Sequence, residues 1–114
     1  MSVKLAPRGH KMLTQEIRKS LPALYSQEEN ADPIVRVKYF SPYSNWSWFG
    51  IEFDGEDIFF GLVSGFEIEL GNFSLKELEE LDFGGGLPAI ERDCYWTPKP
   101  LSAVRESLEK TGWA

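Results

Sequence analysis

The segment from Ser44 to Leu81 constrains the fold most strongly, because hydrophobic alternation, turn residues and a helix cap follow one another in it without interruption. Asp54-Gly55 predicts a tight hairpin turn, and Gly65 interrupts the apolar pattern a second time. Three stretches separated by these signals have the residue pattern of β-strands: 46–53, 57–64 and 66–70. The stretch 57–64 is apolar on both faces, which indicates a strand covered on both sides. Together these signals predict an antiparallel meander.

The alternation within strand 46–53 also predicts which side chains share a face. Phe49, Ile51 and Phe53 are expected on one face together with Ser47, and the other face is expected to carry Trp46, Trp48, Gly50, Glu52 and Asp54. A further strand is predicted over 34–40, with Arg36 and Lys38 on the face opposite Val35, Val37 and Tyr39. Arg36 and Lys38 are then placed to pair with Glu52 or Asp54 across the ladder.

Three helices complete the predicted secondary structure. Thr14 precedes a short helix over 15–20, and the Ser74-Leu-Lys-Glu77 capping box predicts a helix over 75–81. Ser102 is predicted to cap a helix over 103–110 that Gly112 closes, and 90–96 is predicted to form an edge strand. The predicted class is α+β, an antiparallel four- to five-stranded β-meander flanked by short helices in the order α-β-β-β-β-α-β-α.

Length and composition indicate one soluble domain. The chain has 114 residues, of which 42% are hydrophobic, so we expect a single domain over 1–114, with residues 1–11 as a flexible segment. The single cysteine, Cys94, excludes an intrachain disulfide. We find no signal peptide and no apolar run long enough to cross a membrane. These observations predict a cytoplasmic protein that does not contact a membrane.

The charge of the chain is concentrated in one block. The net charge is −6, and the block from Glu52 to Asp93 holds twelve of the 18 acidic residues but only Lys76 and Arg92 of the 12 basic ones. Such a block forms either a solvated face or a binding surface for a basic partner. Direct nucleic-acid binding is disfavoured, because neutralising phosphates requires clustered Lys and Arg.

The sequence indicates no catalytic residue, metal ligand or cofactor site. His10 is the only histidine, and the sequence places no partner to orient it. Carboxylate pairs such as Glu52 with Asp54 would lie about 6.5 to 7 Å apart on one strand face, a spacing compatible with acid–base chemistry or a hard cation, and equally with a soluble surface.

Trp46 and Trp48 have two interpretations. They form either a second small core under the C-terminal helix or a patch that binds a partner, since tryptophan is enriched at binding hot spots. The predicted partner-binding residues combine this pair with nearby charges: Trp46, Trp48, Glu52, Asp54, Glu67, Glu69, Glu77, Glu79, Glu80, Arg92 and Asp93.

Several segments carry a family resemblance over nearly the whole chain: SNWSW, FDGED, FFGLV, ELGNFSLKELE, and ERD followed by KPLS. In these segments the chain resembles an uncharacterised family of short acidic proteins, a domain of unknown function carried by bacterial plasmids, conjugative elements and phages. The resemblance supplies no catalytic or binding residues. It implies a context, because small accessory proteins of mobile DNA often act on host defence systems.

Three functional hypotheses follow. The first is a non-enzymatic accessory protein of a mobile element that binds a protein partner through an acidic and aromatic surface, for example a counter-defence inhibitor of a restriction or CRISPR complex. The second is a small carboxylate- or metal-dependent hydrolase built around Glu52, Asp54 and the Arg92-Asp93 pair. The third is a structural subunit of a conjugation or replication assembly. Oligomeric state is left open.

Overall fold

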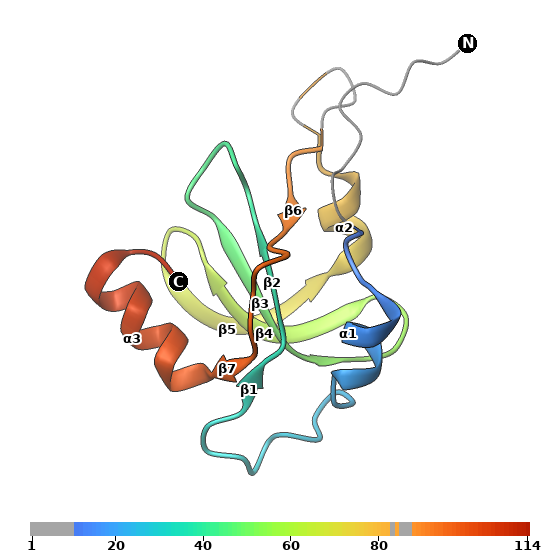
Figure 1. Ribbon diagram of the computed structural model, residues 1–114, viewed down its shortest axis with the longest axis vertical. Helices are drawn as coiled ribbons and strands as arrows, with labels where there is room; N and C mark the ends of the chain where they lie inside the picture. Colours follow the sequence, from blue (N-terminus) through green and yellow to red (C-terminus); the bar gives the residue numbers. More distant parts are fainter. Residues whose placement is uncertain (1–10, 83, 85–87) are drawn as a thin grey trace.

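A computed structural model describes residues 11–82, 84 and 88–114 (Figure 1). The predicted flexible segment therefore lies outside the described residues except for Lys11. The elements, in chain order, are α1 (Gln15–Ser20), β1 (Ile34–Val35), β2 (Val37–Phe40), β3 (Ser47–Phe53), β4 (Ile58–Ser64), β5 (Ile68–Ser74), α2 (Leu75–Glu80), β6 (Glu91–Arg92), β7 (Lys99–Pro100) and α3 (Leu101–Thr111).

The described strands form a five-stranded antiparallel sheet and a separate pair. The sheet has the order β5-β4-β3-β2-β6, so four consecutive strands make a meander and β6 adds to the free side of β2. β1 and β7 pair with each other. The predicted α+β class and the meander are confirmed.

Both faces of the sheet are covered. One hydrophobic cluster contains Tyr39, Phe59, Phe73 and Leu78, with Ile17 of α1 packed against it. The other contains Phe49, Ile51, Leu62, Val104 and Leu108, the last two from α3. Figure 1 shows α3 on one side of the sheet and α1 and α2 on the other. The predicted burial of β4 on both faces is confirmed, since Phe59 and Leu62 belong to different clusters.

A β-bulge in β3 corrects the predicted faces of this strand. The register pairs Trp48 with Val63 and Phe53 with Phe59, and it shifts between Gly50 and Glu52. Val63 and Phe59 lie four residues apart, so Trp48 and Phe53 share a face although five residues separate them. The prediction that Phe53 lies with Phe49 and Ile51 is therefore wrong.

The bulge also places Glu52 on the face opposite Trp48 and Phe53. Glu52 pairs with Phe60, which lies on the same face as Leu62 of the α3-side cluster. Ile51 and Glu52 are thus consecutive residues on one face. The prediction that Glu52 shares a face with Trp46 and Trp48 is wrong, because the extra residue of the bulge intervenes.

The predicted strand 34–40 is interrupted at Arg36. Arg36 and Val37 both lie opposite Gly50, because Arg36 N donates to Gly50 O at 2.8 Å and Val37 is the register partner of the same glycine. The alternation of side chains is therefore broken, and Val35 belongs to the α3-side cluster whereas Val37 belongs to the other cluster. Lys38 is buried at 1% exposure and forms its ion pair with Asp93, at 4.0 Å. The predicted pairing of Lys38 with Glu52 or Asp54 is wrong.

Two of the three predicted helix caps are confirmed, and the third is wrong. α1 and α2 begin where predicted, and the Thr14 and Ser74 hydroxyls accept from the backbone N–H groups of Ile17 and Glu77. Ser102 does not cap α3, which begins at Leu101 without a side-chain cap from Pro100. Instead, Asp32 accepts hydrogen bonds from the backbone N–H and hydroxyl of Ser102, at 2.8 and 2.6 Å.

Candidate functional site

Three aromatic side chains form the centre of the candidate site. Trp48 belongs to β3, Trp46 precedes that strand, and Phe66 lies in the connection between β4 and β5. The Trp46 ring centroid is 5.9 Å from that of Trp48 and 5.3 Å from that of Phe66. Phe66 is 95% exposed, and both tryptophans are half-buried. A Cβ at Gly65 would lie 2.5 Å from the Trp46 ring, so this glycine lets the indole lie against the backbone.

Glu67 and Glu69 border the aromatic centre on the β5 side. With Trp46, Val63 and Phe66 they line a hollow of about 200 Å³. The register pairs Glu69 with Val63 and Val63 with Trp48, so all three side chains lie on one face of the sheet. Both glutamates are exposed.

Glu77 and Glu80 border the centre on the α2 side. They line a second hollow, of about 390 Å³, together with Trp48, Phe73 and Leu78. Trp48 lines this hollow and contacts Trp46, which lines the first, so the indole pair lies between the two neighbouring hollows. We refer to the seven residues as the aromatic–acidic surface: Trp46, Trp48, Phe66, Glu67, Glu69, Glu77 and Glu80.

Hydrogen bonds to Asp57 fix the start of α2, the helix that carries Glu77 and Glu80. Asp57 Oδ2 accepts from the Ser74 hydroxyl at 2.7 Å, and Oδ1 accepts from Lys76 N at 2.7 Å. The backbone oxygen of Asp57 accepts from Leu75 N at 2.9 Å. These bonds satisfy helix N–H groups that have no partner within the helix, and they tie α2 to the beginning of β4.

The aromatic–acidic surface carries uncompensated negative charge. Within the described part of the chain, none of its four carboxylates forms an ion pair. Lys76 and Arg92 are the two bases of the acidic block, and neither lines the two hollows. Glu79 of α2 does not line either hollow; burial raises the pKa of Tyr39, the charge of Arg92 opposes this effect, and the Glu79 carboxylate adds a smaller increase.

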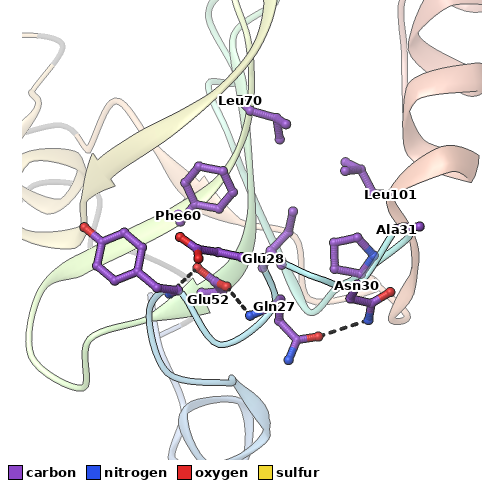
Figure 2. Close-up of a pocket in the computed structure, with 11 residues that line it drawn as sticks. Gln27, Glu28, Asn30, Ala31, Glu52, Phe60, Leu70 and Leu101 are labelled. Atoms are coloured by element: carbon purple, nitrogen blue, oxygen red, sulfur yellow. Dashed lines mark hydrogen bonds between the residues drawn. The ribbon is translucent and has the colours of Figure 1, made fainter.

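Glu52 and Asp54 do not belong to this surface. Glu52 is buried at 3% exposure on the other face of the sheet, where its carboxylate oxygens accept from Tyr25 N at 2.9 Å and Gln27 N at 2.7 Å (Figure 2). Asp54 Oδ1 accepts from the backbone N–H groups of the hairpin turn, at 2.7 to 3.0 Å, from Asp57, Glu56 and Ile58. Those bonds hold the pKa of Asp54 below its usual value.

Arg92 and Asp93 lie at the opposite edge of the sheet, in and after β6. Arg92 Nε donates to Lys11 O at 2.6 Å, and Asp93 accepts from Tyr95 N at 2.9 Å. Both line a separate hollow of about 210 Å³ with Arg36 and Trp96. The residues of the hydrolase hypothesis thus occupy three separate places: a buried face, a hairpin turn and a sheet edge.

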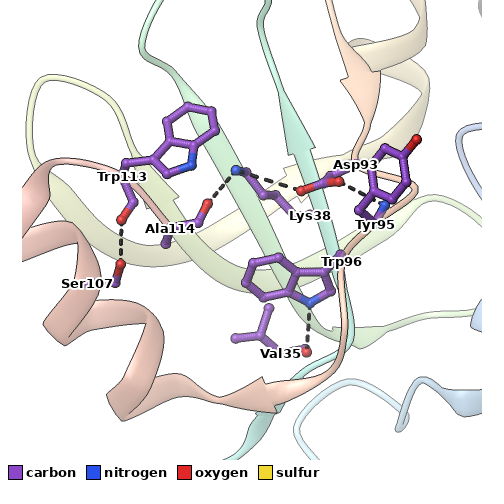
Figure 3. Close-up of polar contacts among 8 residues, drawn as sticks. All are labelled: Val35, Lys38, Asp93, Tyr95, Trp96, Ser107, Trp113 and Ala114. Carbon is purple, nitrogen blue, oxygen red and sulfur yellow. Dashed lines mark hydrogen bonds and ion pairs between the residues drawn. The ribbon is translucent and has the colours of Figure 1, made fainter.

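The sequence patterns do not indicate the exposed position of Phe66 or the burial of Lys38. The sequence pattern places Phe66 in the predicted strand 66–70, although the Gly65 break before it signals a connection in which its ring can project outward. Lys38 lies with its Nζ 3.8 Å from the centroid of the Trp113 ring and hydrogen-bonded to the Ala114 carbonyl (Figure 3). No local pattern signals the burial of Lys38, because the residues that contact its ammonium group, Trp113 and Ala114, lie 75 and 76 positions away.

The described residues contain no helix long and apolar enough to cross a membrane. In the same residues no three or more His, Cys, Asp or Glu side chains gather closely enough to hold a metal ion.

The fold and this surface define a small α+β protein with an exposed aromatic centre and an acidic border. Residues 12–113 match the family described as protein of unknown function DUF2958, and the chain belongs to that family. No curated protein and no solved structure matches the chain.

Proposed function

We propose that the protein binds a basic surface of a protein partner through its aromatic–acidic surface. One observation carries this proposal: two hollows on one face each contain one tryptophan of a contacting indole pair, and the residues that line them include four exposed carboxylates and no Lys or Arg. Binding is the function, and no chemical step is required of these residues.

The aromatic centre supplies binding energy. Large aromatic side chains dominate interface hot spots, because they bury much apolar area with few rotatable bonds. The Phe66 ring, at 95% exposure, is also open to a cation such as an Arg guanidinium. Surrounding carboxylates accept hydrogen bonds from the same cations and speed association at low salt.

The charge pattern favours a nucleic-acid-binding protein as the partner. Such proteins carry clustered Lys and Arg to neutralise phosphates, which complements a border of four carboxylates. The role we propose is that of an accessory protein of a mobile element that occupies the basic surface of a host restriction or CRISPR complex. The family resemblance to cargo of plasmids, conjugative elements and phages supports this context.

A second candidate is a structural subunit of a conjugation or replication assembly. The nearly complete exposure of the Phe66 ring favours it, together with Leu81, which is 47% exposed and lines the α2-side hollow. A subunit contact of this kind depends on apolar burial, and is accordingly insensitive to salt.

The experiment is affinity capture of the tagged protein from lysate of a bacterial host at low and high salt, followed by the same capture with Glu67→Lys/Glu69→Lys. The double reversal is expected to weaken capture of a nucleic-acid-binding complex by about tenfold or more, because each like-charge contact at an interface costs about 1 kcal/mol or more. High salt is expected to release the same complex.

The matched control is Glu106→Lys/Glu109→Lys, which changes net charge equally on exposed positions of α3, across the sheet. Equal losses from both double variants would mean that net charge alone governs capture. A partner retained at high salt and unaffected by the Glu67/Glu69 reversal, but lost in Phe66→Ala, would favour the assembly subunit instead.

A further inference from the structure

A pocket of about 380 Å³ is shown in Figure 2. The register places its residues Glu52, Phe60 and Leu70 on the face of the sheet opposite the aromatic–acidic surface. Its lining comes from five places: the loop from Tyr25 to Pro33, then Ile51 and Glu52 of β3, Phe60 of β4, Leu70 of β5 and Leu101 at the start of α3. The volume lies in the range of pockets that hold small ligands.

Most of the pocket wall is apolar. Phe60 and Leu101 are half-buried, and Leu70 is 44% exposed, so side chains from three elements leave apolar surface open toward one space. An apolar ligand body of a few carbon atoms would gain free energy by covering this surface.

The charge of the pocket has one sign. Glu28 and Glu52 are its charged lining residues, and no Lys or Arg lines it. Glu52 forms no ion pair within the described residues, and its two oxygens accept one backbone N–H each, of about four lone-pair positions on a carboxylate. A buried carboxylate without a counterion favours a bound cation.

The β3 bulge is what directs Glu52 to this pocket. With regular alternation Glu52 would lie on the other face, as the sequence predicted, and bulges commonly re-aim a side chain beside a binding site. Gly61 pairs with Gly50 beside the bulge, and a Cβ at Gly61 would lie 1.8 Å from Phe49 O, so glycine permits the close approach of the two strands there. The backbone is therefore built to place one carboxylate among apolar groups.

We propose that this pocket binds a small amphipathic amine, with its ammonium group at Glu52 and Glu28 and its aliphatic part against Phe60, Leu70 and Leu101. This site is independent of the proposed partner binding, because it uses the other face of the sheet and none of the residues of the aromatic–acidic surface.

The test compares three probes of equal chain length, n-hexylammonium, n-hexanol and n-hexanoate, by NMR titration of the ¹⁵N-labelled full chain at pH 7. Hexylammonium is expected to bind about tenfold tighter than hexanol, because it adds a charge-assisted hydrogen bond. Hexanoate is expected to bind weakest. The shifts are expected at the Tyr25 and Gln27 amides, which donate to Glu52, and at Leu70.

Glu28→Gln and Glu29→Gln provide a matched pair of variants. Both residues are exposed neighbours in one loop, but only Glu28 lines the pocket. Glu28→Gln is expected to weaken hexylammonium binding about threefold and to leave hexanol binding unchanged, as fits a partly exposed charge contact. Glu29→Gln is expected to change neither, and unshifted Tyr25 and Gln27 amides in the free variants show that the loop is intact.

Several results would overturn the proposal. They are no binding of hexylammonium, binding of hexanol or hexanoate as tight as that of hexylammonium, equal losses in the two variants, or shifts centred on Glu67 and Glu69. Nα-acetyl-lysine methylamide is expected to bind more weakly than hexylammonium. Tighter binding of this peptide-like probe would assign the pocket to a lysine of a partner protein and contradict the free amine.

Discussion

Lys38 is a charged side chain at a buried position of β2, and its surroundings explain how the fold tolerates it. Its Nζ lies 3.8 Å from the centroid of the Trp113 ring and 4.0 Å from Asp93 Oδ2, and it donates to the Ala114 carbonyl (Figure 3). Burial lowers the pKa of Lys38, Asp93 opposes this effect, and Lys99 adds to it. Lys38 thus contacts the segment after α3 and links it to the sheet, although burial disfavours the charged form of its side chain.

This lowered pKa predicts a specific dependence of stability on pH. The folded protein releases the Lys38 proton at a lower pH than the unfolded chain, for which the ordinary value is 10.5. Between those two pKa values the unfolded state binds more protons, so this residue makes the free energy of unfolding rise with pH. Urea unfolding of the wild type and Lys38→Met from pH 7 to about 10 is expected to show a wild-type-minus-variant difference that grows with pH.

Lys110→Met controls for the loss of one positive charge, since Lys110 is exposed and pairs with Glu106 at 2.7 Å. A Lys38→Met difference that stays constant or falls with pH would show that the folded protein does not depress this pKa.

At the scale of elements, the bulge in β3 decides what each face of the sheet presents. It places Trp48 and Phe53 on the α2 side and Ile51 and Glu52 on the α3 side. Gly61 is its partner in β4, and a Cβ there would meet Phe49 O at 1.8 Å, a backbone atom that cannot move aside cheaply. Gly71, the β5 neighbour of Gly61 in the register, has no such contact within 4 Å.

Alanine at these two paired glycines is expected to have opposite effects. Gly61→Ala is expected to lower the free energy of unfolding by about 3 kcal/mol, because overpacking against backbone forces a shift of the paired strands. Gly71→Ala is expected to leave it unchanged or raise it by up to about 1 kcal/mol, because alanine loses less entropy in a strand. Urea unfolding measures both, and similar values for the two variants would show that the bulge tolerates a side chain.

At the scale of the whole molecule, one sheet separates two hydrophobic clusters but belongs to both. β3 and β4 each contribute buried side chains to the α2 side and the α3 side, such as Phe53 with Ile51 and Phe59 with Leu62. Neither cluster can lose its packing while the other keeps an intact sheet. The shared strands are the physical reason to expect the described residues to unfold as one unit.

This arrangement predicts one cooperative unfolding transition. Methyl signals of Val37, in the α2-side cluster, and Val104, in the α3-side cluster, are expected to disappear at the same urea concentration in the wild-type protein. NMR follows the methyl signals of both residues in the same unmodified protein. Separate midpoints would mean that the faces unfold as independent units.

Sequence patterns anticipated the elements better than the surfaces. The Thr14 and Ser74 caps and the Gly112 helix end involve atoms within one turn of chain, so the predicted helix ends match the structure closely. The candidate surface was anticipated in part, because the predicted set contained Trp46, Trp48, Glu67, Glu69, Glu77 and Glu80 but lacked Phe66. Its other members, Glu52, Asp54, Glu79, Arg92 and Asp93, do not line the two hollows.

By itself the sequence determined the α+β class, the meander, the helix termini set by local caps and the acidic block between Glu52 and Asp93. Only the tertiary structure decided that Lys38 is buried, that Glu52 turns away from Trp48, and that acids of β5 and α2 meet around one aromatic centre. The physical reason is the separation along the chain between the residues that interact. Caps and turns act within a few residues, whereas a bulge depends on the backbone of the paired strand, and burial depends on segments distant in the chain.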